Sequence, residues 1–450
     1  MKSEEAGVRG HLLRVFGLGF GLAVVIGGVI GSGIMRNPGI VAAGFPDPKW
    51  VLLAWLAGGV VVMIDAMPTV ELGAAIPLAG GPYSLAARAF GPLTGFLVGW
   101  ADWLQNAVST GFITVAFGEF VQRMGLFTSL TTGEIAIGLV LACGLINWIG
   151  TRVGGASQNI GSALKAVGLT ILVAALFLAH GKGVAPPAPP PAAFFWGAPA
   201  ILAIQAIYGA YGGWHAAVYF SEEVHQPERN VARATFGGIV LVTGLYLLVN
   251  AAVLKVLPIG VLAQSKLAVA DAAMAVLGPI SGKIVTGLAI ISVATIANLQ
   301  IMEYVRTGFA MARNGVMPPS LARVSKSGTP RVSLAVVLVV TIAIILCADL
   351  IKGQLYQILL EIYAPFVMLV FLVLALASIR LRLAEPDLPR PWKMPLFPLP
   401  ALMSAAINVV LLVAFFLRND WKTSASSVGL LAGGMLIYLV GRSRWKPLTD

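Results

Sequence analysis

Apolar runs long enough to cross a lipid bilayer recur along the whole chain, and this feature limits the fold more than any other. A bilayer core of about 30 Å needs about 20 mostly apolar residues per helix. Charged residues make up only 11% of the 450 residues and the mean hydropathy is +0.89, values that no water-soluble domain of ordinary composition reaches. Segments of about ten residues with alternating hydrophobicity, typical of a transmembrane β-barrel, do not occur. We therefore expect an all-α integral membrane protein.

Glycine, proline and charged residues divide the apolar runs into twelve predicted transmembrane helices. An even number places both termini on one side of the membrane. Roughly two thirds of the lysines and arginines then fall in connections on that side, so the positive-inside rule puts both termini in the cytoplasm, beneath the plasma (inner) membrane. Arg36 and Lys165 are exceptions within helices. The predicted helices are 13–43, 50–76, 84–121, 131–149, 157–180, 197–222, 233–257, 278–309, 332–350, 355–381, 399–417 and 424–441.

The remaining composition argues against other classes of protein. The net charge of +11 does not indicate a nucleic-acid partner, because the basic residues are spread between apolar runs rather than gathered on a soluble domain. The four histidines are scattered and no paired carboxylates have a spacing that suggests hydrolysis or metal binding. We expect a single domain over 1–450 with no enzymatic activity, no cofactor and no metal. Its expected partners are the lipid bilayer and a small molecule, and its oligomeric state is left open.

Two clusters of helix-breaking residues fall at comparable depths in the first and sixth predicted helices. Each opens a block of five helices, 13–180 and 197–381, and two further helices follow in 399–441. This arrangement is typical of an inverted repeat with discontinuous helices. Glycines can instead serve close helix packing, but the matched positions favour a ligand site. The clusters are Gly27-Gly28-Val29-Ile30-Gly31-Ser32-Gly33 and Tyr208-Gly209-Ala210-Tyr211-Gly212-Gly213.

An interrupted helix frees main-chain polar groups, which a membrane tolerates only beside a polar cavity or a ligand. N–H groups at the start of the outer half of the first helix suit a carboxylate. Carbonyl groups around Tyr208, Gly209 and Tyr211 suit an ammonium group. A small zwitterion is therefore the expected ligand. The residues predicted to contact it at the breaks are Ile30, Gly31, Ser32, Gly33, Ile34, Tyr208, Gly209, Ala210, Tyr211, Gly212 and Trp214.

Short motifs in the two clusters and in other predicted helices and connections carry a family resemblance. They are Gly31-Ser32-Gly33-Ile34, Val70-Glu71-Leu72-Gly73, Gly80-Gly81-Pro82-Tyr83, Ala210-Tyr211-Gly212-Gly213-Trp214, Met311-Ala312-Arg313-Asn314-Gly315 and Arg390-Pro391-Trp392-Lys393. With these motifs the chain resembles the amino acid-polyamine-organocation superfamily, and its L-type amino-acid transporter branch most of all. The resemblance extends over nearly the whole chain.

The resemblance implies a LeuT-type fold of five plus five inverted helices, with helices 1 and 6 interrupted and alternating access to a central amino-acid site. We expect sodium-independent exchange or facilitated transport of neutral L-amino acids. Proton-coupled symport and transport of polyamines or cationic amino acids are the alternatives, and a non-transporting sensor is a remote one. Several relatives place a lysine at the position of Lys165, where sodium-coupled relatives hold an ion. Relatives often carry a bulky aromatic residue at the position of Gly209, so Tyr208 or Tyr211 takes that role here, or the pocket is wider.

Ionisable side chains inside predicted helices need a partner or a function. Lys165 is expected to link the broken first helix to the eighth, unless its stem snorkels to the surface. Asp102, with Asn106 one turn later on the same face, contacts substrate, carries a proton or is a satisfied structural carboxylate. His215 carries a proton or is a neutral, hydrogen-bonded side chain.

Other acidic residues are expected to have structural roles. Asp65 is predicted to hydrogen-bond between helices. Glu303 and Arg306, three positions apart, are predicted to pair at the cytoplasmic end of the eighth helix. The third group forms either an inner electrostatic latch or solvated surface, and we favour surface; its members are Glu222, Glu223, Glu228 and Arg229.

Overall fold

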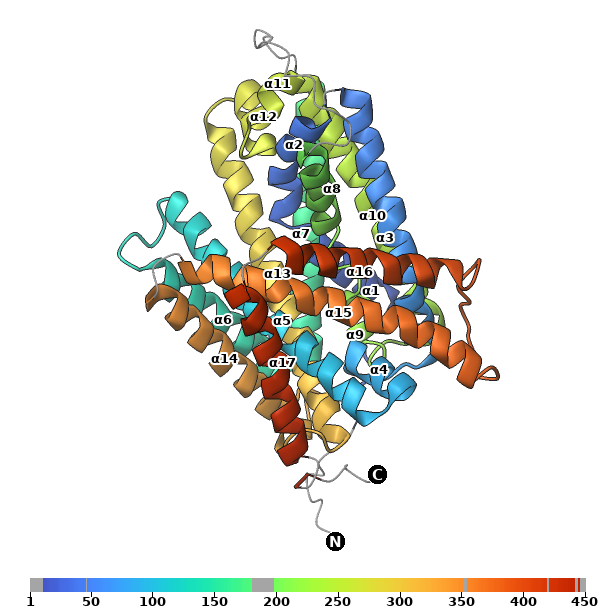
Figure 1. Cartoon of the computed structure of the whole chain (residues 1–450). Helices are drawn as coiled ribbons and strands as arrows, with labels where there is room; N and C mark the ends of the chain where they lie inside the picture. Colours follow the sequence, from blue (N-terminus) through green and yellow to red (C-terminus); the bar gives the residue numbers. More distant parts are fainter. Residues whose placement is uncertain are drawn as a thin grey trace.

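The computed structural model is a bundle of helices joined by short connections (Figure 1). It describes residues 11–45, 47–179, 198–350, 354–418, 421–441 and 444–445, with side chains except at 198, 348–363, 418 and 422–423. Within these ranges there is no β-strand, only an isolated bridge between Phe16 and Val224. The prediction of an all-α protein is therefore confirmed for the described chain.

Eight described helices are long and apolar enough to cross a membrane, and a bent pair of shorter helices makes a ninth candidate. The bent pair is α1 (Leu18–Val29) and α2 (Ser32–Gly44). The eight long helices are α3 (Pro48–Ala75), α6 (Thr132–Ile149), α7 (Thr151–Leu178), α10 (Pro227–Val256), α13 (Ile280–Arg313), α15 (Gln354–Ala384), α16 (Leu399–Arg418) and α17 (Trp421–Gly441). The chain is thus a multi-pass membrane protein.

The remaining helices are shorter or less apolar. They are α4 (Pro82–Phe90), α5 (Pro92–Arg123), α8 (Ala198–Ala210), α9 (Ala216–Tyr219), α11 (Ile259–Leu262), α12 (Ala268–Leu277), the 3-10 helix η1 (Pro319–Ala322) and α14 (Arg331–Leu350).

Several predicted helix boundaries are wrong, and the first helix begins at Leu18 rather than at residue 13. The single helix expected over 84–121 is divided into α4 and α5 at Gly91, whose φ of +88° costs a glycine nothing. Pro92 then occupies the first position of α5, where its missing N–H is harmless. Two further helices start one to two turns earlier than expected, α7 at Thr151 and α10 at Pro227.

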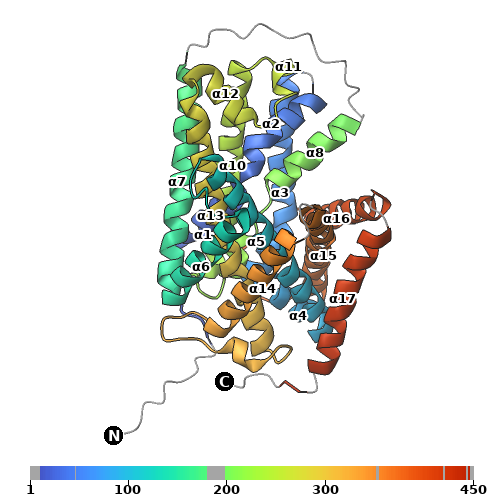
Figure 2. The same ribbon diagram turned by 90° about the vertical axis from the view of Figure 1, so that its left-hand side faces the viewer.

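The first described residues and the C-terminal ends of α13 and α17 lie at one end of the molecule, which we call the termini end (Figure 1). The short helices α11 and α12 lie at the opposite end, the far end (Figure 2). Between the ends, α5 packs along α13, and α3 packs along α10. Helices α15 and α16 cross this core at a steep angle to α7 (Figure 2). The two interrupted helices lie inside this framework, with α2 packed against α8.

Candidate functional site

The first membrane helix is interrupted where the sequence predicts it. Helices α1 and α2 are separated by Ile30 and Gly31 and bend by 47°. Both residues are extended, with φ and ψ of −71° and 96° for Ile30 and −124° and −161° for Gly31. No side chain caps α2, so the N–H groups of its first turn lack a partner within the helix. These donors and the positive end of the helix dipole make the start of α2 a suitable site for an anion.

Side chains from two other helices occupy carbonyl oxygens at this break. Lys165 of α7 donates to Gly27 O and, at 2.7 Å, to Ile30 O. Ser292 of α13 donates to the same Ile30 oxygen at 2.8 Å. Lys165 is only 2% exposed, so its ammonium group does not snorkel to the surface. The buried amino group of Lys165 thus holds the broken helix beside α7 and α13.

The sixth predicted helix is also interrupted. Helix α8 ends at Ala210, residues 211–215 form turns, and α9 follows. Within these turns Tyr211 N donates to Ile207 O at 3.3 Å and Gly212 N to Gly209 O at 3.1 Å. Among the residues described, none donates to the carbonyl oxygen of Tyr211. Tyr211 is 1% exposed, so this oxygen is a buried acceptor at the break.

The two breaks touch each other. A Cβ atom at Gly213 would lie 2.6 Å from the carbonyl carbon of Gly28, and Gly213 also has a φ of +99°. Tyr246 of α10 connects the same two segments, since its hydroxyl lies 2.8 Å from Val29 O and 3.0 Å from Ala210 O. Tyr246 is fully buried and was not predicted as a site residue. In the sequence, the only sign of a role for Tyr246 was that its hydroxyl group lies within an apolar run.

The two tyrosines of the second cluster turn toward α3. Tyr208 donates to Asp65 Oδ2 at 2.8 Å, and Tyr211 donates to the carbonyl oxygen of Trp55 at 2.9 Å. Gly209, between them, is exposed, and a Cβ atom there would meet nothing within 4 Å. The tyrosine hydroxyls are therefore anchored away from the open side of α8, which carries glycine.

Asp65 is a hydrogen-bonding group between helices, as predicted. Besides Tyr208 of α8, it accepts from Ser404 at 2.6 Å and from Asn408 at 3.3 Å, both on α16. Because Asp65 is 1% exposed, these donors replace the water that a buried carboxylate would lose. The carboxylate links α3, α8 and α16.

Asp102 occupies a similar position on the other side of the second break. It accepts from Tyr219 at 2.5 Å, Gln105 at 2.8 Å and Thr307 at 3.0 Å, which belong to α9, α5 and α13. Asn106 donates to the main-chain oxygen of Asp102 at 3.0 Å. Asp102 is completely buried, so its hydrogen bonds fasten the lower half of the sixth helix to α5 and α13.

Trp214 and His215 lie against α15. The ring of Phe371 is 5.0 Å from Trp214 and 5.2 Å from His215, centroid to centroid. The Nδ1 atom of His215 is buried, and the described residues give it no hydrogen-bond partner. This nitrogen is the unsatisfied polar atom nearest in sequence to the second break.

The acidic pair that follows α9, Glu222 and Glu223, is buried, so the prediction of a solvated surface is wrong for these two residues. Arg229 is exposed and Glu228 is half-buried. Glu223 forms a two-point ion pair with Arg306, and Glu222 lies 2.9 Å from Arg313. The predicted pairing of Arg306 with Glu303 is also wrong, since both Glu223 oxygens accept from Arg306 instead. The alternative of an inner electrostatic latch describes this geometry.

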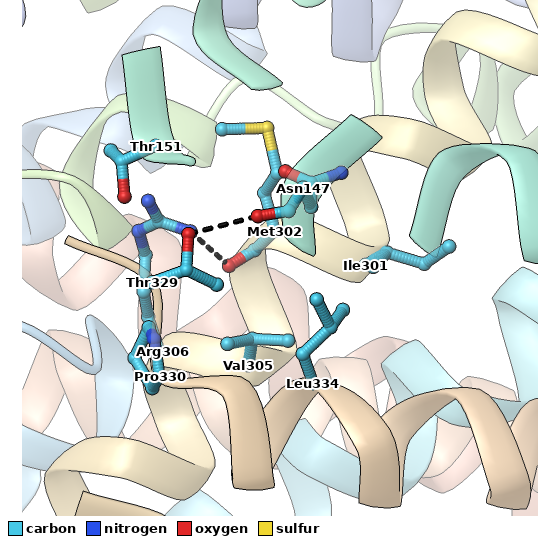
Figure 3. Close-up of a pocket in the computed structure, with 9 residues that line it drawn as sticks. All are labelled: Asn147, Thr151, Ile301, Met302, Val305, Arg306, Thr329, Pro330 and Leu334. Carbon is cyan, nitrogen blue, oxygen red and sulfur yellow. Dashed lines mark hydrogen bonds between the residues drawn. The ribbon is translucent and has the colours of Figure 1, made fainter. Parts of the chain in front are cut away.

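A small polar cavity lies beside this latch, between α6, α7, α13 and the segment before α14 (Figure 3). Arg306 donates to Met302 O at 2.7 Å and Thr329 donates to Asn147 O at 2.8 Å across it. Its volume of about 10 Å³ is enough for roughly one water molecule. The cavity is therefore too small for an amino acid.

These features define a class of protein. Paired helix breaks leave main-chain groups free deep in a helical membrane bundle, and a buried ammonium group occupies oxygens at one break. Such an arrangement is typical of a secondary transporter that binds a small charged or zwitterionic solute. Within the described chain no cluster of three or more His, Cys, Asp or Glu side chains is placed to hold a metal ion.

Comparison with known proteins identifies the family. Residues 20–440 match the amino acid permease family, and the chain belongs to it. It is therefore a membrane transporter of amino acids and not an enzyme.

Three similar proteins align with nearly the whole of this chain. The serine/threonine exchanger SteT of Bacillus subtilis (strain 168) is 28% identical over 452 residues, covering 97% of this chain and 98% of SteT. The human large neutral amino acids transporter small subunit 2 is 28% identical over 476 residues, covering 98% of this chain and 83% of the relative. The mouse Asc-type amino acid transporter 1 is 29% identical over 454 residues, covering 98% and 84%.

Proposed function

We propose that this chain carries neutral L-amino acids by sodium-independent exchange or facilitated transport, through an alternating-access cycle. Two of the similar proteins support this assignment by name, one as a serine/threonine exchanger and one as a transporter of large neutral amino acids. The bound solute is a zwitterion whose carboxylate and ammonium groups need opposite partners, and the two breaks offer both.

The proposed architecture is a LeuT-type fold of twelve membrane helices with two inverted repeats. The repeats are 13–180 and 197–381, and each begins with an interrupted helix. The last two helices lie in 399–441. The basic residues on the side of the termini support a cytoplasmic location for that end, in the plasma (inner) membrane.

In the proposed site the substrate carboxylate meets the N–H groups of Ser32, Gly33 and Ile34, next to the extended Ile30 and Gly31. The uncapped start of α2 supports this placement. The ammonium group lies against the second break, where the carbonyl oxygen of Tyr211 accepts no hydrogen bond from the described residues. The other residues proposed to contact the substrate there and on α5 are Tyr208, Gly209, Ala210, Gly212, Trp214, Asp102 and Asn106.

The hydrogen bonds of Lys165 to Gly27 O and Ile30 O are the observation that carries the proposal. A carbonyl cage at a helix break is the kind of site where sodium-coupled transporters hold their ion. Here a covalently attached ammonium group fills the cage. Since the charge cannot leave with the substrate, its presence removes the need for sodium.

Proteoliposomes test this proposal. Uptake of labelled L-leucine, L-serine and L-threonine into wild-type vesicles should rise when the same amino acid is loaded inside, and replacing sodium by choline should not change it. Lys165→Met should reduce this uptake at least about tenfold, because the break loses its buried donor. Lys255→Met, which changes an exposed lysine at the end of α10, is the matched control and should keep full uptake. Sodium-dependent uptake by the wild type would contradict the proposal.

Proton-coupled symport is the second candidate, and two buried groups favour it. Glu303 is 4% exposed and accepts no hydrogen bond from the described residues, while His215 Nδ1 is likewise unsatisfied. Either side chain could carry a proton through the cycle. A pH gradient alone would then drive uptake into empty vesicles, and Glu303→Gln or His215→Gln would abolish that drive.

A further inference from the structure

One face of α2 is exposed along its length. Ser32, Arg36 and Ile40, spaced four residues apart, lie on this face and are exposed. The adjoining face packs on α8, where Asn37 donates to Ala206 O at 2.7 Å. The exposed face begins at the first residue of the half-helix, next to the free N–H groups of the proposed carboxylate site.

The neighbouring helix α8 has a matching open face. Gln205, Gly209 and Gly212 are exposed, whereas the hydroxyls of Tyr208 and Tyr211 are bonded to α3. The two half-helices lie side by side in the half of the molecule away from the termini (Figure 1). Helical geometry puts the exposed faces of this antiparallel pair on the same side, opposite α3. Together they form one surface leading to the breaks.

The part of this surface nearest the breaks carries the polar side chains of Ser32, Arg36 and Gln205, which indicates that water rather than lipid covers that part. The exposed apolar residues Ile40 and Leu202 lie nearer the far end. A guanidinium group facing the bilayer core is costly, and such residues almost always face an aqueous cavity or a partner. Arg36 has no ion-pair or hydrogen-bond partner within the described part of the chain. The positive end of the helix dipole offers it no compensation either. Its position is therefore not explained by the stability of the fold.

We propose that Arg36 is a charge filter at the entrance to the amino-acid site. The inference rests on the proposed function and narrows its substrate class. The guanidinium group attracts the substrate carboxylate toward Ser32, Gly33 and Ile34, and it repels amino acids and polyamines with a net positive charge. Neutral and acidic amino acids pass the filter, and arginine, lysine and putrescine do not.

The filter is tested by removing or reversing the charge in proteoliposomes. At low ionic strength, Arg36→Gln should raise the KM for L-leucine about threefold to tenfold, the effect of one charge in a hydrated setting, with little change in kcat. Inhibition of leucine uptake by L-arginine and putrescine should become stronger. Arg36→Glu should enlarge both changes. At about 0.15 M salt, where charges are screened beyond about 8 Å, the differences should shrink.

Lys49→Gln is the matched control, because Lys49 is an exposed cation at the start of α3, outside the surface that leads to the breaks. Its KM should equal that of the wild type. An unchanged leucine KM and unchanged arginine inhibition in Arg36→Gln would overturn the filter while leaving the carrier intact. Wild-type uptake of arginine as fast as leucine would also overturn it. A wild type that takes up no amino acid would instead overturn the proposed function and the filter with it.

Discussion

The two ends of the interrupted helices are held together by different forces. At the termini end, two buried acidic residues after α9 pair with arginines of α13, and the Glu223 carbonyl accepts from the main chain of Val15 and Phe16 at 2.9 Å. At the far end, contact is mainly between backbones. A Cβ atom at Gly39 would lie 2.3 Å from Ser265 O, and one at Gly44 would lie 2.6 Å from Pro199 O.

This difference indicates which end is closed in the present conformation. Separating the termini end requires buried charges to part and regain water, which is costly unless both are rehydrated together. The far end is held by close fit, and its surface at Arg36 and Gly209 is already exposed. The structure is therefore latched by buried ion pairs at the termini end, whereas the far end has close main-chain packing and exposed residues beside the breaks.

The largest expected loss of stability comes from removing one partner of the buried Glu223–Arg306 ion pair. Arg306→Met leaves Glu223 buried without its partner, at a side-chain exposure of 0%. Removing one member of a buried ion pair typically costs about 3–5 kcal/mol, so the melting temperature in detergent should fall steeply. Combining this change with Glu223→Leu should restore much of the loss, because an apolar pair needs no compensation. Equal melting temperatures for wild type and Arg306→Met would show that charge pairing does not hold this end.

A smaller effect is expected from disturbing the fit at the far end. Gly39→Val places a branched side chain against the carbonyl oxygens of Ser265 and Leu262. Overpacking of this kind typically costs about 1–3 kcal/mol, measurable as a lower melting temperature. Gly138→Val on α6, where a Cβ atom would meet nothing within 4 Å, is the control. If both valine variants melt alike, close backbone packing is not what joins α2 to the α11–α12 region.

The smallest effect is expected at the exposed ion pair of the termini end. Arg88 lies 2.8 Å from Glu385, and this hydrogen bond lowers the pKa of Glu385 below its ordinary value of 4.5. A lowered pKa stabilises the fold above pH 4.5, and the contribution is lost as the pH falls through the lowered value. Because both groups are solvated, Glu385→Gln should leave the melting temperature at neutral pH unchanged. A fall in melting temperature as large as that of Arg306→Met would mean that burial is not what makes the Glu223–Arg306 pair stronger than the exposed pair.

Local features of the sequence predicted the breaks well. Glycine and serine clusters in apolar runs, and a lysine inside an apolar helix, are visible within a few residues of sequence. The division at Gly91 followed by Pro92 was equally visible but was missed, because the long apolar pattern on both sides favoured one continuous helix. The paired breaks needed no knowledge of distant contacts. For Lys165 the local sequence left burial and snorkelling open, and the family resemblance favoured burial, since its partners lie 138 and 135 residues away.

Features that depend on distant partners could not be predicted from spacing. Tyr246 was overlooked because one of its partners, Val29, is 217 residues away. Glu222 was assigned to the surface because its donors, the amides of Leu12 and Ala79, lie 210 and 143 residues away. A charged residue next to a predicted helix end has solvent as its default partner, and only the packed bundle replaces that solvent with main-chain amides.

The contact between Gly28 and Gly213 limits how this protein can diversify. Any larger residue at either position would push the main chains of the two breaks apart, so these sites tolerate almost no variation whatever solute is carried. The open faces of α2 and α8 carry no such restriction. Under the proposed function, new substrate preferences arise in descendants of this chain through changes at positions such as Arg36 and Gly209, while the glycine contact beneath them stays the same.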